Sequence, residues 1–244
     1  MTISALILAA GRGQRMRPLT DSTPKPLLKV RGQALIDWHI QALAEGGFTR
    51  LVVNTDWLGK QISAYLEHQI ALKPNKYGCE QLSISYSHEG LDFGCALETA
   101  GGIARVLPLL GDVFWVLAGD VFTPGFTFAQ NAVDRFTTSG KLAHLWLVAN
   151  PAHNLKGDFG LSADGLALNL PADSQQQCYT FSTIALYRKA FFNSLPFGNP
   201  PGVKAALAPL LRQAMDNKQV SAELYPGAWT DVGTPERLAQ LNQT

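Results

Sequence analysis

The first half of the chain alternates short apolar runs with stretches whose apolar residues recur at helical spacing. Runs typical of buried or half-buried strands are Ala5–Leu8, Leu51–Val53, Leu82–Tyr86 and Val113–Leu117. Helical spacing is found over residues 35–43 and 57–66, and a third helix is expected over about 100–107 with Thr99 as its N-cap. Strands that alternate with helices predict a mainly parallel sheet with right-handed crossovers.

The second half of the chain is less regular. Further strands are predicted at Leu142–Val148, Phe159–Leu161, Tyr179–Tyr187 and Val220–Leu224. A helix is predicted over residues 203–217, where Pro209 should either kink the helix or mark its true start. Thr234 and Pro235 give another helix a threonine N-cap and a proline at its first position. We expect one α/β domain over residues 1–244, Rossmann-like, with a mainly parallel, mixed central sheet flanked by helices.

Charge and cysteine content narrow the class of protein. With 20 Lys and Arg against 19 Asp and Glu, the net charge of +1 gives no reason to expect nucleic acid or an anionic membrane as a partner. No apolar run approaches the roughly 18 residues that a membrane-spanning helix needs. The three cysteines include no C-x-x-C pair, a usage typical of a reducing cytosol. We therefore expect a cytoplasmic protein.

The stretch Leu6–Pro26, LILAAGRGQRMRPLTDSTPKP, combines a strand end with a cationic loop. Small residues at Ala10, Gly11 and Gly13 let the backbone approach a ligand closely, and the loop that follows carries three arginines and Lys25. Backbone N–H groups and cations at a strand end suit a polyphosphate. The alternative is a surface loop with solvated arginines. The dinucleotide fingerprint is incomplete and no Walker motif is present, so neither of the two commonest phosphate loops applies.

Two aspartates follow predicted strand ends. Asp120 comes after the apolar run Val113–Leu117, and Asp231 precedes Gly233. One or two carboxylates together with substrate phosphates are a common site for Mg²⁺, whereas an isolated aspartate at such a place more often has a turn or helix-cap role. No histidine or serine motif indicates a general base or a nucleophile. These residues suit transfer of a nucleotidyl group to a sugar 1-phosphate, whose attacking oxygen is already ionised.

Five stretches in the expected order resemble the sugar-1-phosphate nucleotidyltransferases, and together they span nearly the whole chain. They are LILAAGRGQRMRPLTDSTPKPLLKV, LETAGGI, LAGD, GDFGL and WTDVGTPERL. Within the family, the compact length and the stretches NPAHNLKGDFGL, YTFSTIAL and LAPLLRQAM are most similar to bacterial N-acetylmuramate α-1-phosphate uridylyltransferases, enzymes of cell-wall (peptidoglycan) recycling. Mannose-1-phosphate guanylyltransferases share the first motif, the LETAGG-type loop and VGTPERL, and are the alternative.

The resemblance implies roles for the matching positions. Arg15 and Lys25 would be catalytic. Arg15 would contact the triphosphate, and Lys25 would hold the α-phosphate and the sugar phosphate. The nucleotide-binding residues would be Ala10, Gly11, Gly13, Glu98 and Gly101. The sugar pocket would include Gly160, Asn169 and Ser182, and Mg²⁺ would be held by Asp120 and Asp231. Residues 1–125 would then form the nucleotide-binding part and residues 126–244 the sugar-binding part with the second metal ligand. The expected partners are an NTP and a sugar 1-phosphate, in a monomer or small homo-oligomer.

The chain also departs from the family pattern. Ala118 replaces an asparagine that is frequent before the metal aspartate, and residues 168–171 lack the glutamate-lysine-proline run of many relatives. Thr183 stands where a glycine is usual. A rival reading from another class is a regulatory protein that binds nucleotide sugars without turnover. Intact Arg15, Lys25, Asp120 and Asp231 argue against it, because a pure binder would be free to lose them.

Overall fold

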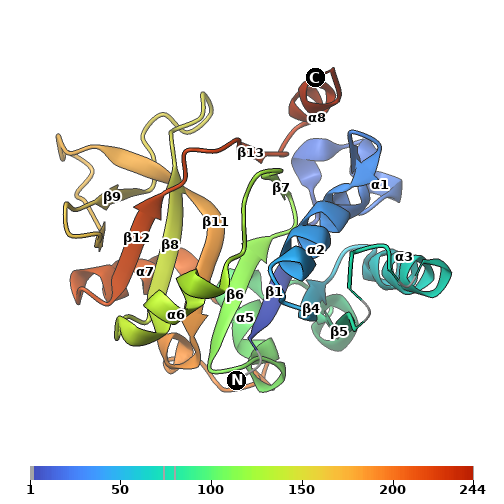
Figure 1. Cartoon of the computed structure of the whole chain (residues 1–244), viewed down its shortest axis with the longest axis horizontal. Coiled ribbons are helices and arrows are strands. Elements are labelled where there is room, and N and C mark those ends of the chain that lie inside the picture. The colour runs from blue at the N-terminus through green and yellow to red at the C-terminus, as the bar shows by residue number, and fades with distance from the viewer. Residues whose placement is uncertain (1–2, 74, 80, 244) are drawn as a thin grey trace.

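The computed structural model describes residues 3–73, 75–79 and 81–243. Among these residues, nine strands form one mixed sheet (Figure 1). They are β1 (Ser4–Ala9), β4 (Arg50–Thr55), β5 (Ser83–His88), β6 (Val113–Ala118), β8 (Ala143–Val148), β9 (Phe159–Leu161), β10 (Ala167–Leu168), β11 (Cys178–Arg188) and β12 (Val220–Leu224). Two small two-stranded sheets pair β2 (Lys29–Val30) with β3 (Gln33–Ala34) and β7 (Val121–Phe122) with β13 (Thr230–Asp231).

The strand order is β10-β9-β11-β6-β1-β4-β5, and β8 pairs with both β11 and β12. The four strands β6, β1, β4 and β5 are mutually parallel, as the alternation of strands and helices in the first half predicts. Beyond β6 the sheet is mixed, because β11 runs antiparallel to β6, β8 and β9, whereas β12 runs parallel to β8. The prediction of a mainly parallel, mixed sheet in an α/β domain is confirmed.

Helices cover both faces of this sheet (Figure 1). Their bounds are α1 (Leu19–Ser22), α2 (Leu35–Glu45), α3 (Gly59–Leu72), α4 (Glu89–Phe93), α5 (Glu98–Val106), α6 (Gln130–Thr138), α7 (Leu207–Asp216) and α8 (Pro235–Gln243). Because side chains alternate along β6, Trp115 and Leu117 pack with α2, α3 and α6, whereas Phe114 and Val116 pack with α5 and α7. None of the helices in the described part of the chain has the length and hydropathy to cross a membrane.

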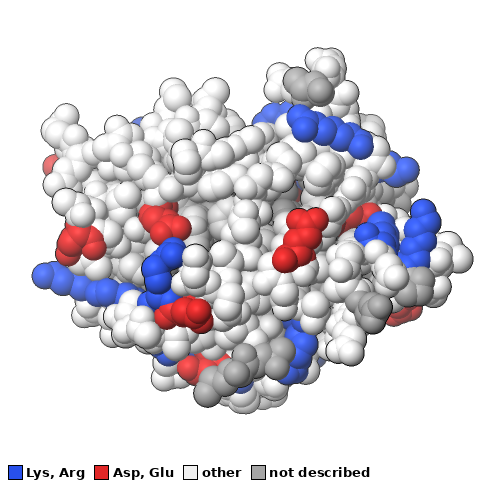
Figure 2. All heavy atoms as spheres, in the orientation of Figure 1, with Lys and Arg blue, Asp and Glu red and all other residues white. Residues whose placement is uncertain are grey.

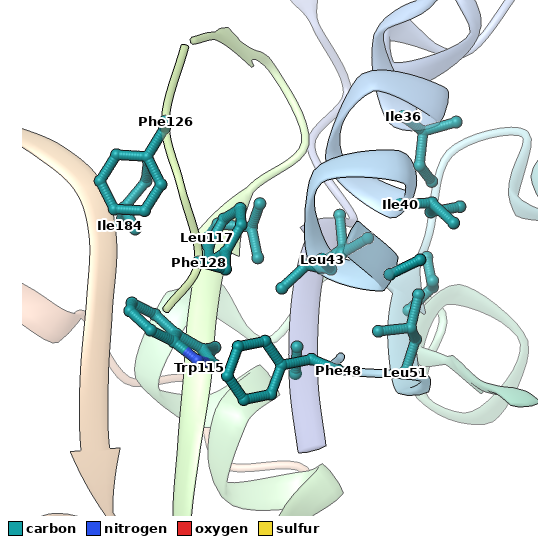
Figure 3. Close-up of a cluster of buried hydrophobic side chains, with 14 of the residues drawn as sticks. Ile36, Ile40, Leu43, Phe48, Leu51, Trp115, Leu117, Phe126, Phe128 and Ile184 are labelled. Carbon is teal, nitrogen blue, oxygen red and sulfur yellow. The ribbon is translucent and has the colours of Figure 1, made fainter. Parts of the chain in front are cut away.

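Aromatic residues fill the core beneath α2. The Trp115 ring lies 5.1 Å from the Phe128 ring and 5.9 Å from the Phe48 ring, both edge-on (Figure 3). Ile40 and Leu43 of α2 belong to the same buried cluster. This packing fixes the strands whose carboxyl ends form the cavity described below.

Most predicted elements have boundaries close to those observed, and the exceptions have physical reasons. The helix α5 begins at Glu98 without a side-chain cap, so the prediction that Thr99 caps it is wrong. The helix α7 begins at Leu207, and Pro209 therefore lies in its first turn, where a proline is tolerated. Thr234 does cap α8, since its hydroxyl accepts a bond from the Arg237 amide at 3.4 Å. The short helix α6 was not predicted.

Candidate active site

A cavity of about 700 Å³ opens at the carboxyl ends of the parallel strands. The ends of β1 and β6 form its floor, and residues of β9, β11 and α7 form the opposite wall. Ligands of open α/β sheets bind at this edge, because the loops that leave the strands diverge there. Five of the predicted site residues line the cavity: Ala10, Gly11, Lys25, Glu98 and Asp120.

The first loop approaches the cavity with its backbone. Gly11 has open space where a Cβ would point, so nothing blocks a ligand from lying against it. Gly13 is not part of the cavity lining; its φ of +65° is the left-handed conformation that favours glycine, and its carbonyl accepts a bond from the Thr20 hydroxyl at 2.8 Å. The structure thus gives Gly13 a role in the turn, and its predicted contact with a nucleotide stays a prediction.

Lys25 is the cation at the floor of the cavity. Its side chain is only 8% exposed, and its Nζ lies 2.6 Å from an Oδ atom of Asp120. Lys25 begins a 3₁₀ turn, Lys25–Leu27, whereas Asp120 follows β6. The sheet therefore brings the predicted catalytic lysine and the predicted metal ligand into direct contact.

The three arginines of the first loop have different surroundings. Arg17 donates to Asp21 at 2.8 Å, and Arg12 lies 3.6 Å from the same carboxylate with its guanidinium 3.4 Å from the Trp57 ring centre. Arg15 is exposed, and within the described residues its side chain makes no hydrogen bond or ion pair. Arg15 does not line the cavity, but of the three guanidiniums it is the one left available to a ligand.

Asp231 lies beside the cavity rather than in its lining. The strand β13 pairs with β7, and the Val232 amide donates to the Asp120 carbonyl at 2.9 Å, so the two aspartates lie on paired chain segments. The Asp231 carboxylate accepts a bond from Arg237 at 2.7 Å and lies 3.5 Å from His153. In the described residues no cluster of three or more His, Cys, Asp or Glu side chains forms a metal site.

A buried carboxylate, Glu89, links chain segments at the cavity floor through hydrogen bonds. Its Oε1 accepts from the Asn54 side chain at 2.7 Å, and its Oε2 accepts from the Leu97 amide at 2.7 Å. Asn54 in turn accepts from the Ala9 amide at 2.8 Å. Burial raises the pKa of Glu89, against which these two hydrogen bonds favour the charged form. The network joins the end of β1 to the start of α5, and nothing in the sequence indicated it.

Comparison with known proteins shows which family the chain belongs to. A family model described as nucleotidyl transferase matches residues 4–165, more than half of the chain. The chain is 44% identical to the N-acetylmuramate alpha-1-phosphate uridylyltransferase of Neisseria meningitidis serogroup B, over 98% of this chain and 96% of that protein. The chain belongs to the nucleotidyl transferase family. The uridylyltransferase of the same name from Caulobacter vibrioides is 30% identical, over 95% of this chain and 92% of that protein.

The fold of this nucleotidyl transferase also has a solved counterpart. A crystal structure from Bacillus anthracis, described as a glucose-1-phosphate thymidylyltransferase in complex with sucrose, superimposes with a TM-score of 0.77. The match covers 99% of this chain and 94% of the other at 20% sequence identity. At that identity the likeness concerns the fold alone.

Of the two residues of this nucleotidyl transferase predicted to border the base, Glu98 lines the cavity and Gly101 does not. Glu98 lines the cavity with a φ of +58°, a left-handed conformation that costs a non-glycine residue free energy. Gly101 lies inside α5, and a Cβ there would overlap the carbonyl oxygen of Val203. Close packing against Val203 therefore accounts for a glycine at position 101. The predicted contact of Gly101 with the nucleotide stays a prediction.

The three predicted sugar-binding residues lie behind the lining of the cavity. Ser182 is fully buried and donates to the Trp146 carbonyl at 2.6 Å. Gly160 has Leu168 and Leu170 where its Cβ would point, and Asn169 bonds to Arg212 and Asp216. Their direct contact with sugar stays a prediction; the neighbouring residues Phe159 and Thr183 are the ones that line the cavity.

Thr183, which stands where the family usually has a glycine, adopts a backbone conformation that favours glycine. It has a φ of +66° at an irregularity in the pairing of β11 with β8, which is why a glycine suits this position. A β-branched residue is strained there, and strain of this kind clusters at functional sites. Thr183 is part of the cavity lining, on the wall formed by β11.

Proposed function

We propose that this chain transfers the uridylyl group of UTP to N-acetylmuramic acid α-1-phosphate, giving UDP-N-acetylmuramic acid and pyrophosphate. The observation that carries the proposal is the 44% identity to a uridylyltransferase of that specificity over nearly the whole of both chains. The cavity supports it, because the residues of its floor suit phosphate chemistry and its 700 Å³ accommodate a nucleotide sugar.

The reaction needs charge neutralisation more than proton transfer. A phosphate oxygen of the sugar 1-phosphate attacks the α-phosphorus of UTP; a new P–O bond forms, and the bond to the β-phosphate oxygen breaks with its electron pair on pyrophosphate. Lys25 lies at the cavity floor, where negative charge accumulates as the two phosphates approach. The attacking oxygen is already ionised, so no general base is required of the chain.

Ala10, Gly11 and Glu98 line the same end of the cavity and would border the nucleotide. Arg15, exposed and without a protein partner in the described chain, would contact the triphosphate and the departing pyrophosphate. The parallel strands of residues 1–125 supply this end. The antiparallel strands and α7, within residues 126–244, supply Phe159, Thr183 and the other residues of the sugar end.

The two aspartates fit Mg²⁺ by the chemistry of their donors. Carboxylate oxygens are the ligands that Mg²⁺ prefers, and a site of one or two carboxylates is completed by water and phosphate oxygens. When bound, Mg²⁺ would neutralise charge on the phosphates. Asp120 and Asp231 would hold the metal ion. In doing so, Asp120 would give up its ion pair with Lys25, and Asp231 its ion pair with Arg237.

Two further features concern the setting of the enzyme. Cys79, Cys95 and Cys178 are unpaired, which supports a reducing compartment such as the cytoplasm. On the face shown in Figure 2, basic and acidic side chains are interspersed between broad uncharged areas. That distribution gives this face no basic patch of the kind that binds nucleic acid.

Pyrophosphate release tests the proposal. Each of UTP, GTP, CTP, ATP and dTTP would be paired with the α-1-phosphates of N-acetylmuramic acid, N-acetylglucosamine, glucose and mannose in the presence of Mg²⁺. We expect the highest kcat/KM for UTP with N-acetylmuramic acid 1-phosphate. Release with GTP and mannose 1-phosphate alone would identify the alternative enzyme, and no release with any pair would favour a nucleotide-sugar-binding protein.

A further inference from the structure

Resting on this proposed function, we propose that Arg212 binds the carboxylate of the lactyl ether in N-acetylmuramic acid 1-phosphate and thereby selects this sugar. A muramic acid differs from a glucosamine by that ether, so a single anionic group distinguishes the two substrates. A residue that recognises the group sets specificity without acting on the reacting phosphates.

Arg212 is a cation of the cavity wall whose charge has no acidic partner. Within the described residues its guanidinium forms no ion pair, and it donates a hydrogen bond to the neutral Asn169 side chain at 2.7 Å. Lys25, the other cation of the lining, is paired with Asp120. A half-buried guanidinium without a counter-charge, with most of its five N–H donors unused, suits a carboxylate from a ligand.

Neighbouring side chains hold Arg212 in place. The Asn169 amide nitrogen donates to both carboxylate oxygens of Asp216, at 3.0 and 3.2 Å, and this turns the amide oxygen toward Arg212. On another side the guanidinium lies 5.2 Å from the centre of the Phe159 ring, which also lines the cavity. Asn169 is therefore a positioning residue for Arg212, which gives this predicted sugar-binding residue an indirect role.

The start of α7 adds positive potential to the same wall. Ala206, Leu207 and Ala208 line the cavity, and no side chain caps this helix of ten residues. Helix N-termini attract anions through their free amides and the helix dipole. Helical side chains lean toward the N-terminus, so the Arg212 guanidinium and the helix start act on one region of the cavity.

That region is separate from the phosphate end. Phe159 lies on β9, whereas Asp120, which Lys25 contacts, follows β6, and β11 lies between these two strands. Two strand spacings of about 4.8 Å separate the two ends by roughly 10 Å across the sheet. The anion that Arg212 contacts is therefore a different group from the phosphates at Lys25, as a substituent on the far side of the sugar ring would be.

The test compares two sugars in two variants. Wild type, Arg212→Met and Arg212→Lys are assayed with UTP and the α-1-phosphates of N-acetylmuramic acid and N-acetylglucosamine, which lacks the lactyl carboxylate. The same proteins are titrated calorimetrically with the two UDP-sugars. The matched control is Arg50→Met, because Arg50 begins β4 at the end of the strand away from the cavity. Thermal melting verifies that each variant folds.

In Arg212→Met we expect the preference for the muramic sugar, measured as the ratio of kcat/KM values or of UDP-sugar Kd values, to fall at least about tenfold, mainly through KM. That is the size of one lost charge-assisted hydrogen bond. Arg212→Lys keeps the charge but not the planar fork, so its ratio should fall less. If Arg212→Met does not fold, Arg212→Lys decides, with a fall of a few fold expected.

An unchanged ratio in a folded variant, or an equal loss for both sugars, would overturn the role of Arg212. Failure of the proposed function looks different: wild type itself would not transfer the uridylyl group to N-acetylmuramic acid 1-phosphate, whatever the residue at 212.

Discussion

The ammonium group of Lys25 lies 2.6 Å from a carboxylate oxygen of Asp120, although 95 residues separate the two in the sequence. The carboxylate supplies a counter-charge for the buried Lys25 ammonium at the cavity floor and so offsets part of the cost of its burial. Substrate phosphates and a metal ion are the natural replacements for this pairing, since the first would bind the lysine and the second the carboxylate.

Lys25→Met should lower kcat by about 10² to 10³-fold, because a preorganised cation that stabilises developing charge is lost. Affinity for UTP, measured by calorimetry, should change much less, since the charge acts chiefly on the transition state. A change confined to KM would make Lys25 a binding residue instead.

Asp120→Asn and Asp231→Asn should each remove most turnover while the proteins keep cooperative thermal unfolding. A neutral amide is a poor replacement for a carboxylate ligand of Mg²⁺. Removal of divalent ions with a chelator should likewise stop wild-type turnover, and added Mg²⁺ should restore it. The exposed Asp173→Asn serves as the charge control. Near-normal rates in both active-site variants would refute the metal assignment.

Arg15→Met and Arg17→Met form a matched pair two residues apart. Arg17 is neutralised by Asp21, an exposed pair of the kind that contributes about 1 kcal/mol or less, so its loss should change kcat/KM by less than about threefold. Arg15 has no such partner in the described chain, and its loss should lower kcat/KM for UTP at least about tenfold. Equal effects in steady-state assays would show that the loop acts as a general positive surface.

Gly101→Ala should destabilise the protein by about 1 to 3 kcal/mol, because the added methyl group overlaps the Val203 carbonyl in a close-packed region. Gly11→Ala is the control in urea unfolding, since its Cβ meets open space. The control should retain stability but bind UTP more weakly, as the methyl group enters the cavity. Wild-type stability in Gly101→Ala would mean that the segment around Val203 yields easily.

His39 should make the fold sensitive to mild acid. Burial lowers its pKa from 6.5 to about 4, and no hydrogen-bond partner in the described chain reaches its Nε2. A depressed pKa contributes stability that is present above pH 6.5 and is lost as the pH falls toward 4; the shift corresponds to something on the order of 3 kcal/mol.

The comparison is the free energy of unfolding against pH for wild type and His39→Asn, whose amide nitrogen takes the place of the hydrogen-bonded Nδ1. Between pH 6.5 and 4 the wild type should lose stability more steeply than the variant. Parallel curves would show that other groups cause the acid sensitivity.

Local signals predicted the elements of this fold well. The apolar run Val113–Leu117 is β6, and Asp120 at its end does reach the cavity. The threonine cap of α8 was equally readable, since one residue and its near neighbours determine it. By contrast, residues 203–206 at the start of the helix predicted over 203–217 are not helical, because the Ala205 backbone bonds to Leu97, Ala100 and Gly101 instead.

What the sequence did not show depends on contacts between distant residues. Asp21 pairs with Arg12 and Arg17 but not with Arg15, a distinction that composition cannot make. Arg212 lies in a stretch that reads as an ordinary amphipathic helix, and its contact with Asn169 spans 43 residues. Asn169 is predicted to contact sugar; it does not line the cavity itself, but it bonds to Arg212, which does.

Uridylyl transfer is tested most directly by ³¹P NMR, which follows the phosphorus atoms themselves. With UTP, N-acetylmuramic acid α-1-phosphate, Mg²⁺ and a catalytic amount of the protein, we expect the triphosphate and sugar-phosphate signals to decline together. A UDP-sugar diphosphate and pyrophosphate should appear in equal amounts. Unchanged signals, or inorganic phosphate without a UDP-sugar, would contradict it.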